Sequence, residues 1–135
     1  MPVPTPAAIE RWHQVVTTRD MALLSDLLDD DVVFLSPVVH TPQQGKALTT
    51  AYLTAAMHTL NNDSFRYLSQ WYGTRSAVLE FATELEGIQI NGVDIIEWND
   101  AGRIIRFKVM VRPLKAINLL HQMMGRALDQ QRKPG

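Results

Sequence analysis

The chain has 135 residues, of which 46% are hydrophobic and 20% are charged, and its formal net charge is -1. This length and composition indicate one globular domain, spanning residues 1–135, with room for a single core. Acidic and basic residues are mixed along the chain, which argues against a nucleic-acid-binding surface or a basic membrane-binding patch. The sequence has no cysteine, so disulfides, thiol nucleophiles and thiolate metal sites are excluded.

The first residues, up to Pro6, lack the basic start and the apolar run that are typical of a signal peptide. No apolar stretch is long enough to span a bilayer. We therefore expect a cytoplasmic protein without a membrane partner.

Two helices are expected at the start of the chain. Thr5 is expected to cap the first, with Pro6 at its first position, and its apolar stripe is formed by Ile9, Trp12, His13 and Val16. Asp20 is expected to cap a shorter second helix, which the acidic run 29–31 ends. The inward side chains of this second helix are Leu24, Leu27 and Leu28.

A strand and a long helix follow. Residues 32–35 predict a strand. We expect Ser36 and Pro37 to end it, because a proline restricts the backbone of the residue before it. After a loop to Gly45, residues 46–60 predict a long helix. Its expected inward face is formed by Leu48, Ala51, Tyr52 and Ala55.

Strands dominate the second half of the chain. They are expected over residues 65–72, 77–86, 93–98 and 103–111, followed by a helix over residues 114–128. The pair Asn91–Gly92 is typical of a hairpin turn. Helices separated from an antiparallel meander predict an α+β fold. A curved sheet around the long helix would leave a cone-shaped, apolar hollow, which is the usual kind of small-molecule site.

Asp94 stands out because it lies within an apolar strand. Side chains alternate along a strand, so Asp94 shares a face with Ile96 and Trp98. On the next strand the apolar face is expected to be formed by Ile105, Phe107, Val109 and Val111.

Charge pairing sets the expected register of these two strands. Glu97 is expected beside Arg106 or Lys108, and this leaves Asp94 on the apolar side, facing Phe107 and Val109. A carboxyl group there is desolvated, and its pKa is expected to be raised. Such a residue is a candidate for a functional site.

These elements resemble the nuclear-transport-factor-2-like superfamily, in its SnoaL-like and ketosteroid-isomerase-like branch. The resemblance covers roughly residues 7–124 and depends on the pattern of residues 20–37, on Gly45 at the start of the long helix, and on residues 92–104. It implies a cone-shaped α+β barrel with a C-terminal helix. The superfamily contains isomerases, cyclases, dehydratases and transport factors, so the resemblance implies a fold more strongly than an activity.

The isomerase pattern implies roles for particular positions. Asp94 falls where that pattern has a protonated acid in the apolar cone. Ser36 stands where the general-base aspartate is expected, and Trp12 stands where a tyrosine donates to the oxyanion. Because serine cannot remove a proton from carbon at neutral pH, ketosteroid isomerisation itself is not expected.

Two interpretations of Asp94 remain open. It is either an acid–base group or ligand anchor, or a structural carboxyl bonded to Trp12, Tyr52, Ser36 or a water. His40, in the loop near the expected mouth, is the second catalytic candidate, and an exposed loop histidine is the competing interpretation. The expected substrate-binding residues are Trp12, Ser36, Tyr52, Trp98, Phe107 and Val109.

No cofactor is expected. The histidines are far apart, without H-x-x-x-H or H-x-H spacing, so we expect no metal. The glycine-rich phosphate loops and the G-x-S-x-G turn are absent too.

Three functions are compatible with this sequence. The first is an apolar small-molecule pocket anchored by Asp94, with isomerase, cyclase or lyase chemistry. The second is a small-ligand-binding protein without chemistry, and the third is a protein-interaction module. A small apolar molecule is the expected partner, no nucleic acid is expected, and the resemblance implies a homodimer formed through the sheet.

Overall fold

The computed structural model describes residues 4–132 of the chain. Helices and strands follow one another in the order α1 (Ala7–Thr18), α2 (Met21–Leu27), β1 (Leu28–Leu35), β2 (Gln43–Gln44), α3 (Lys46–Leu60), β3 (Arg66–Tyr72), β4 (Ser76–Leu85), β5 (Ile88–Trp98), β6 (Ile104–Arg112) and α4 (Leu114–Arg132).

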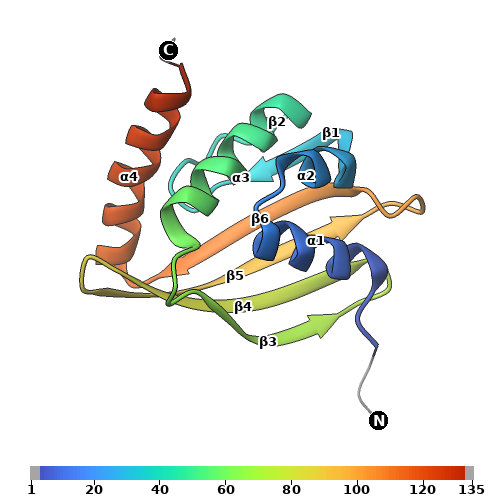
Figure 1. Cartoon of the computed structure of the whole chain (residues 1–135), viewed down its shortest axis with the longest axis horizontal. Coiled ribbons are helices and arrows are strands. Elements are labelled where there is room, and N and C mark those ends of the chain that lie inside the picture. Colours follow the sequence, from blue (N-terminus) through green and yellow to red (C-terminus); the bar gives the residue numbers. More distant parts are fainter. Residues whose placement is uncertain (1–3, 133–135) are drawn as a thin grey trace.

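The strands form one mixed, six-stranded sheet in the order β2-β1-β6-β5-β4-β3. Strands β1 and β6 pair in parallel, and the other neighbours are antiparallel. The sheet is curved and open, with β2 and β3 at its edges, and α1, α2 and α3 lie over one face (Figure 1). Helix α4 stands at the end of the sheet where β6 ends (Figure 1). The predicted α+β cone fold is confirmed.

The expected start of the first helix is wrong by one position. Pro6 is the N-cap of α1, and no side chain caps this helix. The Thr5 hydroxyl lies instead 3.3 Å from the Tyr72 hydroxyl and ties the chain start to the edge strand. At α2 the expectation is confirmed, since the Asp20 carboxylate accepts from the backbone N–H of Ala22 at 2.9 Å.

The acidic run does not end α2. Helix α2 stops at Leu27, and β1 already begins at Leu28, so residues 29–31 lie in a strand. The register between β1 and β6 shifts between Leu28 and Val33. This irregularity turns the acidic side chains outward, and Asp29 accepts from the Asn99 amide at 3.1 Å.

The hairpin expected at Asn91–Gly92 is wrong. Both residues lie inside β5, and the turn falls at Glu86 and Gly87, whose φ angles are 50° and 78°. Positive φ at both central positions is what a tight hairpin needs. Gly92 serves packing instead: an added Cβ would lie 2.6 Å from the Met110 carbonyl oxygen and from the Phe81 ring.

Two expected faces also differ from the observed ones. Leu48 is expected on the inward face of α3 but is 47% exposed. This helix is apolar on most sides, so its sequence pattern does not define one buried face. The buried side chains of α3 include Thr49, Leu53, Met57 and Leu60. On β6 a register shift after Glu97 places Ile104, rather than Ile105, in the core.

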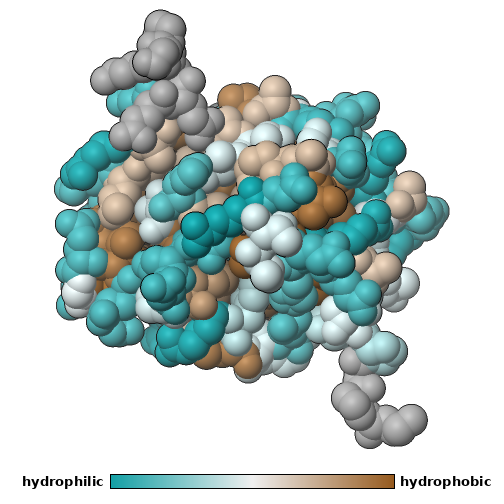
Figure 2. All heavy atoms as spheres, in the orientation of Figure 1, coloured by the Kyte–Doolittle hydropathy of each residue, from teal (hydrophilic) through white to brown (hydrophobic). Residues whose placement is uncertain are grey.

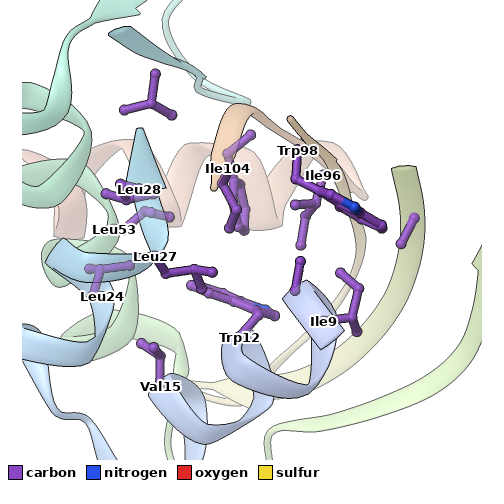
Figure 3. Close-up of a cluster of buried hydrophobic side chains, with 14 of the residues drawn as sticks. Ile9, Trp12, Val15, Leu24, Leu27, Leu28, Leu53, Ile96, Trp98 and Ile104 are labelled. Carbon is purple, nitrogen blue, oxygen red and sulfur yellow. The ribbon is translucent and has the colours of Figure 1, made fainter. Parts of the chain in front are cut away.

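The core lies between the helices and the concave face of the sheet. Figure 3 shows side chains of α1, α2 and α3 packed against β1, β5 and β6, among them Trp12, Leu27, Leu53, Ile96 and Trp98. The face drawn in Figure 2 is mainly hydrophilic, with apolar surface in small separate areas. No helix within residues 4–132 is long and apolar enough to cross a membrane.

The glycine in β5 gives the first prediction. Gly92→Ala should lower the free energy of unfolding by about 1–3 kcal/mol, because the methyl group meets a backbone carbonyl and a packed ring. Gly125→Ala is the matched control. It lies in α4 with open space at its Cβ position, so alanine should stabilise the protein by about 0.5–1 kcal/mol. Urea unfolding measures both changes, and equal effects would contradict the packing role of Gly92.

Candidate functional site

An apolar cavity of about 70 Å³ lies between the helices and the concave face of the sheet. Its walls come from α1, α3 and α4 and from β1, β3, β4, β5 and β6. Most of the lining side chains are aromatic or aliphatic, among them Phe34, Leu53, Phe81 and Phe107. A cavity of this volume is large enough for water, and a larger ligand requires the lining side chains to move.

Asp94 is the carboxyl group in this lining. It is 6% exposed and lies in the middle of β5, paired with Leu79 on β4 and with Val109 on β6. The predicted register is confirmed, because Glu97 pairs with Arg106 and their side chains are 3.5 Å apart. No lysine, arginine or histidine within residues 4–132 forms an ion pair with Asp94. Hydrogen bonding is therefore the interaction that offsets the cost of burying this carboxyl group.

A chain of two hydrogen bonds leads to this carboxyl group. The Trp12 indole Nε1–H donates to the Tyr67 hydroxyl at 2.9 Å, and that hydroxyl donates to Asp94 Oδ2 at 2.7 Å. An indole nitrogen can only donate, so the phenol hydrogen cannot be donated to Trp12 and is available to Asp94. The other oxygen, Oδ1, has no hydrogen-bond partner among the described residues.

Burial sets the protonation of both acidic groups. Desolvation raises the pKa of Asp94 from 3.8 to about 7, and the hydrogen bond from Tyr67 opposes part of this shift. Burial also raises the pKa of Tyr67 well above 10.0, and the neighbouring charge of Asp94 adds to the increase. Tyr67 therefore stays a hydrogen-bond donor at neutral pH, while Asp94 is close to half protonated.

The position of the acidic proton follows from the same chain. Because Oδ2 accepts the hydrogen of Tyr67, a proton bound to Asp94 sits on Oδ1. This group is an O–H donor when protonated and an acceptor when ionised, within an apolar cavity. An isolated donor or acceptor of this kind interacts strongly with a ligand oxygen or C–H, because little water competes.

Ser36 is a second polar group on the cavity wall. Its Oγ accepts from the backbone N–H of Val38 at 3.1 Å, and its own hydrogen has no acceptor among the described residues. The hydroxyl can therefore donate to a bound molecule. The local turn that follows β1 holds it in place.

Five of the residues predicted for the site line one cavity, namely Asp94, Trp12, Ser36, Phe107 and Val109. Tyr52 does not line it and packs instead on Phe34, with ring centroids 5.5 Å apart. Trp98 is 8% exposed and belongs to the core next to Ile96 (Figure 3). His40 is exposed and borders a different hollow, on the other side of the loop after β1.

Tyr67 is the site residue that sequence reasoning missed. Its partner in the sheet is Phe81, on the apolar face that the sequence of β4 does reveal. A register shift between Tyr67 and Ser69 breaks the alternation of β3, so the pattern of that strand does not identify its inner face. Within residues 4–132 no group of three or more His, Asp or Glu side chains could hold a metal ion.

The raised pKa of Asp94 gives a prediction for stability. The folded protein binds this proton more tightly than the unfolded chain, so stability from this group is full below pH 3.8 and is lost as the pH rises to about 7. The total loss is on the order of 4 kcal/mol. Asp94→Asn removes this titration. The free energy of unfolding of the variant, measured in urea, should therefore rise relative to that of the wild type between pH 5 and pH 8.5. A constant difference across this pH range would show that Asp94 titrates normally.

Comparisons with known proteins find similar folds. A steroid delta-isomerase structure from Pseudomonas aeruginosa is 34% identical, with a TM-score of 0.88, over 96% of this chain and 98% of that one. An uncharacterised protein with a cystatin-like fold from Silicibacter pomeroyi is 29% identical, with a TM-score of 0.82, over 89% of this chain and 84% of that one. A putative polyketide cyclase from Sinorhizobium meliloti, at 16% identity and a TM-score of 0.63, covers 78% of this chain and 95% of its own and shares the fold.

A comparison with curated proteins finds no match. The model of the SnoaL-like domain matches residues 9–107, which is most of the chain and includes the strand that carries Asp94. The chain therefore belongs to the SnoaL-like domain family, within the nuclear-transport-factor-2-like fold.

Proposed function

We propose that this protein binds a small apolar carbonyl compound and moves a proton on it, with Asp94 as the acid–base group. The observation that carries the proposal is a buried carboxyl that lines an apolar cavity and whose Oδ1 has no partner within residues 4–132; its burial raises the pKa to about 7. A general acid or base works best when its pKa is close to the working pH. Asp94 meets this condition at neutral pH.

The chemistry follows from the groups on the cavity wall. Ionised Asp94 accepts a proton from a carbon next to the ligand carbonyl, and the electrons of that C–H bond move onto the carbonyl oxygen. The Ser36 hydroxyl donates to that oxygen and stabilises the enolate. Protonated Asp94 then returns its proton to a carbon of the ligand, which yields an isomer or prepares a ring closure.

The aromatic and aliphatic lining supports an apolar ligand. Trp12, Phe107 and Val109 supply shape and apolar area around Asp94. Met57 and Met124 also line the cavity, and the flexible methionine side chain allows a ligand larger than the present cavity to enter. The steroid delta-isomerase relative supports isomerase chemistry, but Ser36 stands in the base position, so a steroid is not part of the proposal.

A non-catalytic binding protein is the second candidate. It is favoured by the small number of ionisable groups on the cavity wall, which are Asp94 and Tyr67. In that case Asp94 only donates a hydrogen bond to the ligand, and the ligand is released without chemical change. The two candidates differ in whether carbon-bound protons of the ligand exchange.

The test uses a panel of small aryl and cyclic ketones. Ligands at a hundred times their dissociation constant should stabilise the fold by about 2.7 kcal/mol, which thermal unfolding detects as a shift of at least about 2–4 °C. For each ligand, NMR in deuterated buffer then measures exchange of the protons next to the carbonyl. We expect exchange with the wild type and, because asparagine keeps a donor but cannot accept a proton, binding without exchange in Asp94→Asn.

Asp31→Asn is the matched control, since Asp31 is an exposed carboxylate away from the cavity. It should bind ligands and exchange their protons like the wild type. Binding without exchange in the wild type would select the non-catalytic candidate. Equal exchange in Asp94→Asn and wild type would remove Asp94 from the mechanism.

We also infer that the open face of the sheet pairs with a second copy of the chain. Its support is an apolar group on that face: Trp71 is 56% exposed and Met110 is 55% exposed. Val78 and Ile95 lie beside Trp71 across the strands, and Val93 lies beside Met110. Buried between two copies, these side chains would form the apolar centre of an interface.

Sedimentation at micromolar concentration tests this inference. The wild type should be a dimer, and Met110→Lys should shift it to the monomer, because a charge is then buried at the interface. Leu114→Lys is the control, as Leu114 is 73% exposed but belongs to α4. A wild-type monomer, or equal effects of both substitutions, would contradict pairing through the sheet.

A further inference from the structure

A second hollow, of about 420 Å³, adjoins the Asp94 cavity. It lies where the C-terminal ends of α1 and α3 meet the beginning of β3. The hollow and the cavity share the lining residues Val16, Asn61, Phe65 and Tyr67. These four residues form the boundary between the two spaces, so a ligand that occupies both must pass along them.

The charges of the hollow are unlike those of the cavity. Arg19 and Arg66 line it, together with His13, and Asp63 is the opposing carboxylate. Neither arginine forms an ion pair within residues 4–132. Each donates to a backbone carbonyl, Arg19 to Asn61 and Arg66 to Ser64 at 3.2 Å. A guanidinium has five N–H donors, so both retain donors for a bound anion.

The end of α1 places the Arg19 side chain at this hollow. Arg19 follows the last residue of α1 with φ 58° and ψ 29°, in the left-handed region, and its backbone N–H donates to the Val15 carbonyl at 2.8 Å. This is a common way for a helix to end. The chain turns away from the helix axis here, and the Arg19 side chain lies on the wall of the hollow.

We propose that the hollow binds a carboxylate on the ligand, so that the preferred substrates are keto acids rather than neutral ketones. The inference rests on the proposed function, since the carbonyl end is the part that reaches Asp94. The fork of a guanidinium matches the two oxygens of a carboxylate. Apolar walls at Val16 and Phe65 fit the carbon chain that joins the two polar ends.

The test uses ω-benzoylalkanoic acids of increasing chain length and their methyl esters as probes. Titration calorimetry should find one chain length at which the acid binds at least about tenfold more tightly than its ester, as charge-assisted hydrogen bonds allow. Arg19→Gln and Arg66→Gln should each reduce this preference, because they weaken binding of the acid more than binding of the ester. Added salt should narrow the gap between acid and ester, because it screens exposed charges.

Two further variants make the test independent of misfolding. Asp63→Asn removes the opposing charge and should strengthen acid binding, a gain that loss of structure cannot produce. Arg103→Gln is the matched control, because Arg103 does not line the hollow, and it should leave the preference unchanged.

The outcomes separate this inference from the proposed function. Equal affinity for acid and ester at every length would overturn the carboxylate site and leave the role of Asp94 intact. Acid binding that depends on Arg19 and Arg66 but is unchanged in Asp94→Leu would keep the carboxylate site and overturn the proposed function. Failure of every probe to bind would overturn both.

Discussion

An indole N–H donates a hydrogen bond and cannot accept one, and this asymmetry orders the polar part of the cavity. Trp12 donates to the Tyr67 hydroxyl oxygen, so the hydroxyl hydrogen points away from the indole and is donated to Asp94. The carboxyl is thereby divided into one oxygen held by the protein and one left to a ligand. A histidine in place of Trp12 could donate or accept, and the direction of the chain would no longer be fixed.

Holding such a carboxyl in the middle of β5 lowers stability above neutral pH, and the rest of the fold offsets that cost. Asp94 lies between Leu79 and Val109 in a sheet whose concave face is mostly apolar. The large core between α1, α2 and the sheet supplies the hydrophobic stabilisation. The site is thus continuous with the main core, since Trp12, Phe34, Leu53, Met57 and Phe107 belong to both.

Much of the fold and part of the site could be predicted from the sequence. The alternation of residues 77–86 and the pairing of Glu97 with Arg106 depend on local patterns, and both are confirmed. The site partner Tyr67 could not be found in this way, because a register shift interrupts the alternation of β3. Asn91–Gly92 was misleading for a related reason, since a glycine that favours turns also permits the close approach of Phe81 and Met110.

The face of α3 could not be predicted because a helix that is apolar on most sides has no preferred side by pattern alone. Its orientation is decided by distant partners, such as Phe34 on β1 and the helix α4. The placement of Tyr52 outside the cavity depends on this orientation. Sequence patterns thus determine the elements better than the direction in which each one faces.

The hydrogen-bond chain joins residues that are 55 and 27 positions apart. It can form only after α1, β3 and β5 have come together, and such non-local contacts tend to form slowly. In the unfolded chain Asp94 has an ordinary carboxyl pKa and is ionised at neutral pH. Folding at neutral pH therefore takes up protons from solution, and the stability that this group contributes declines as the pH rises from 3.8 to about 7.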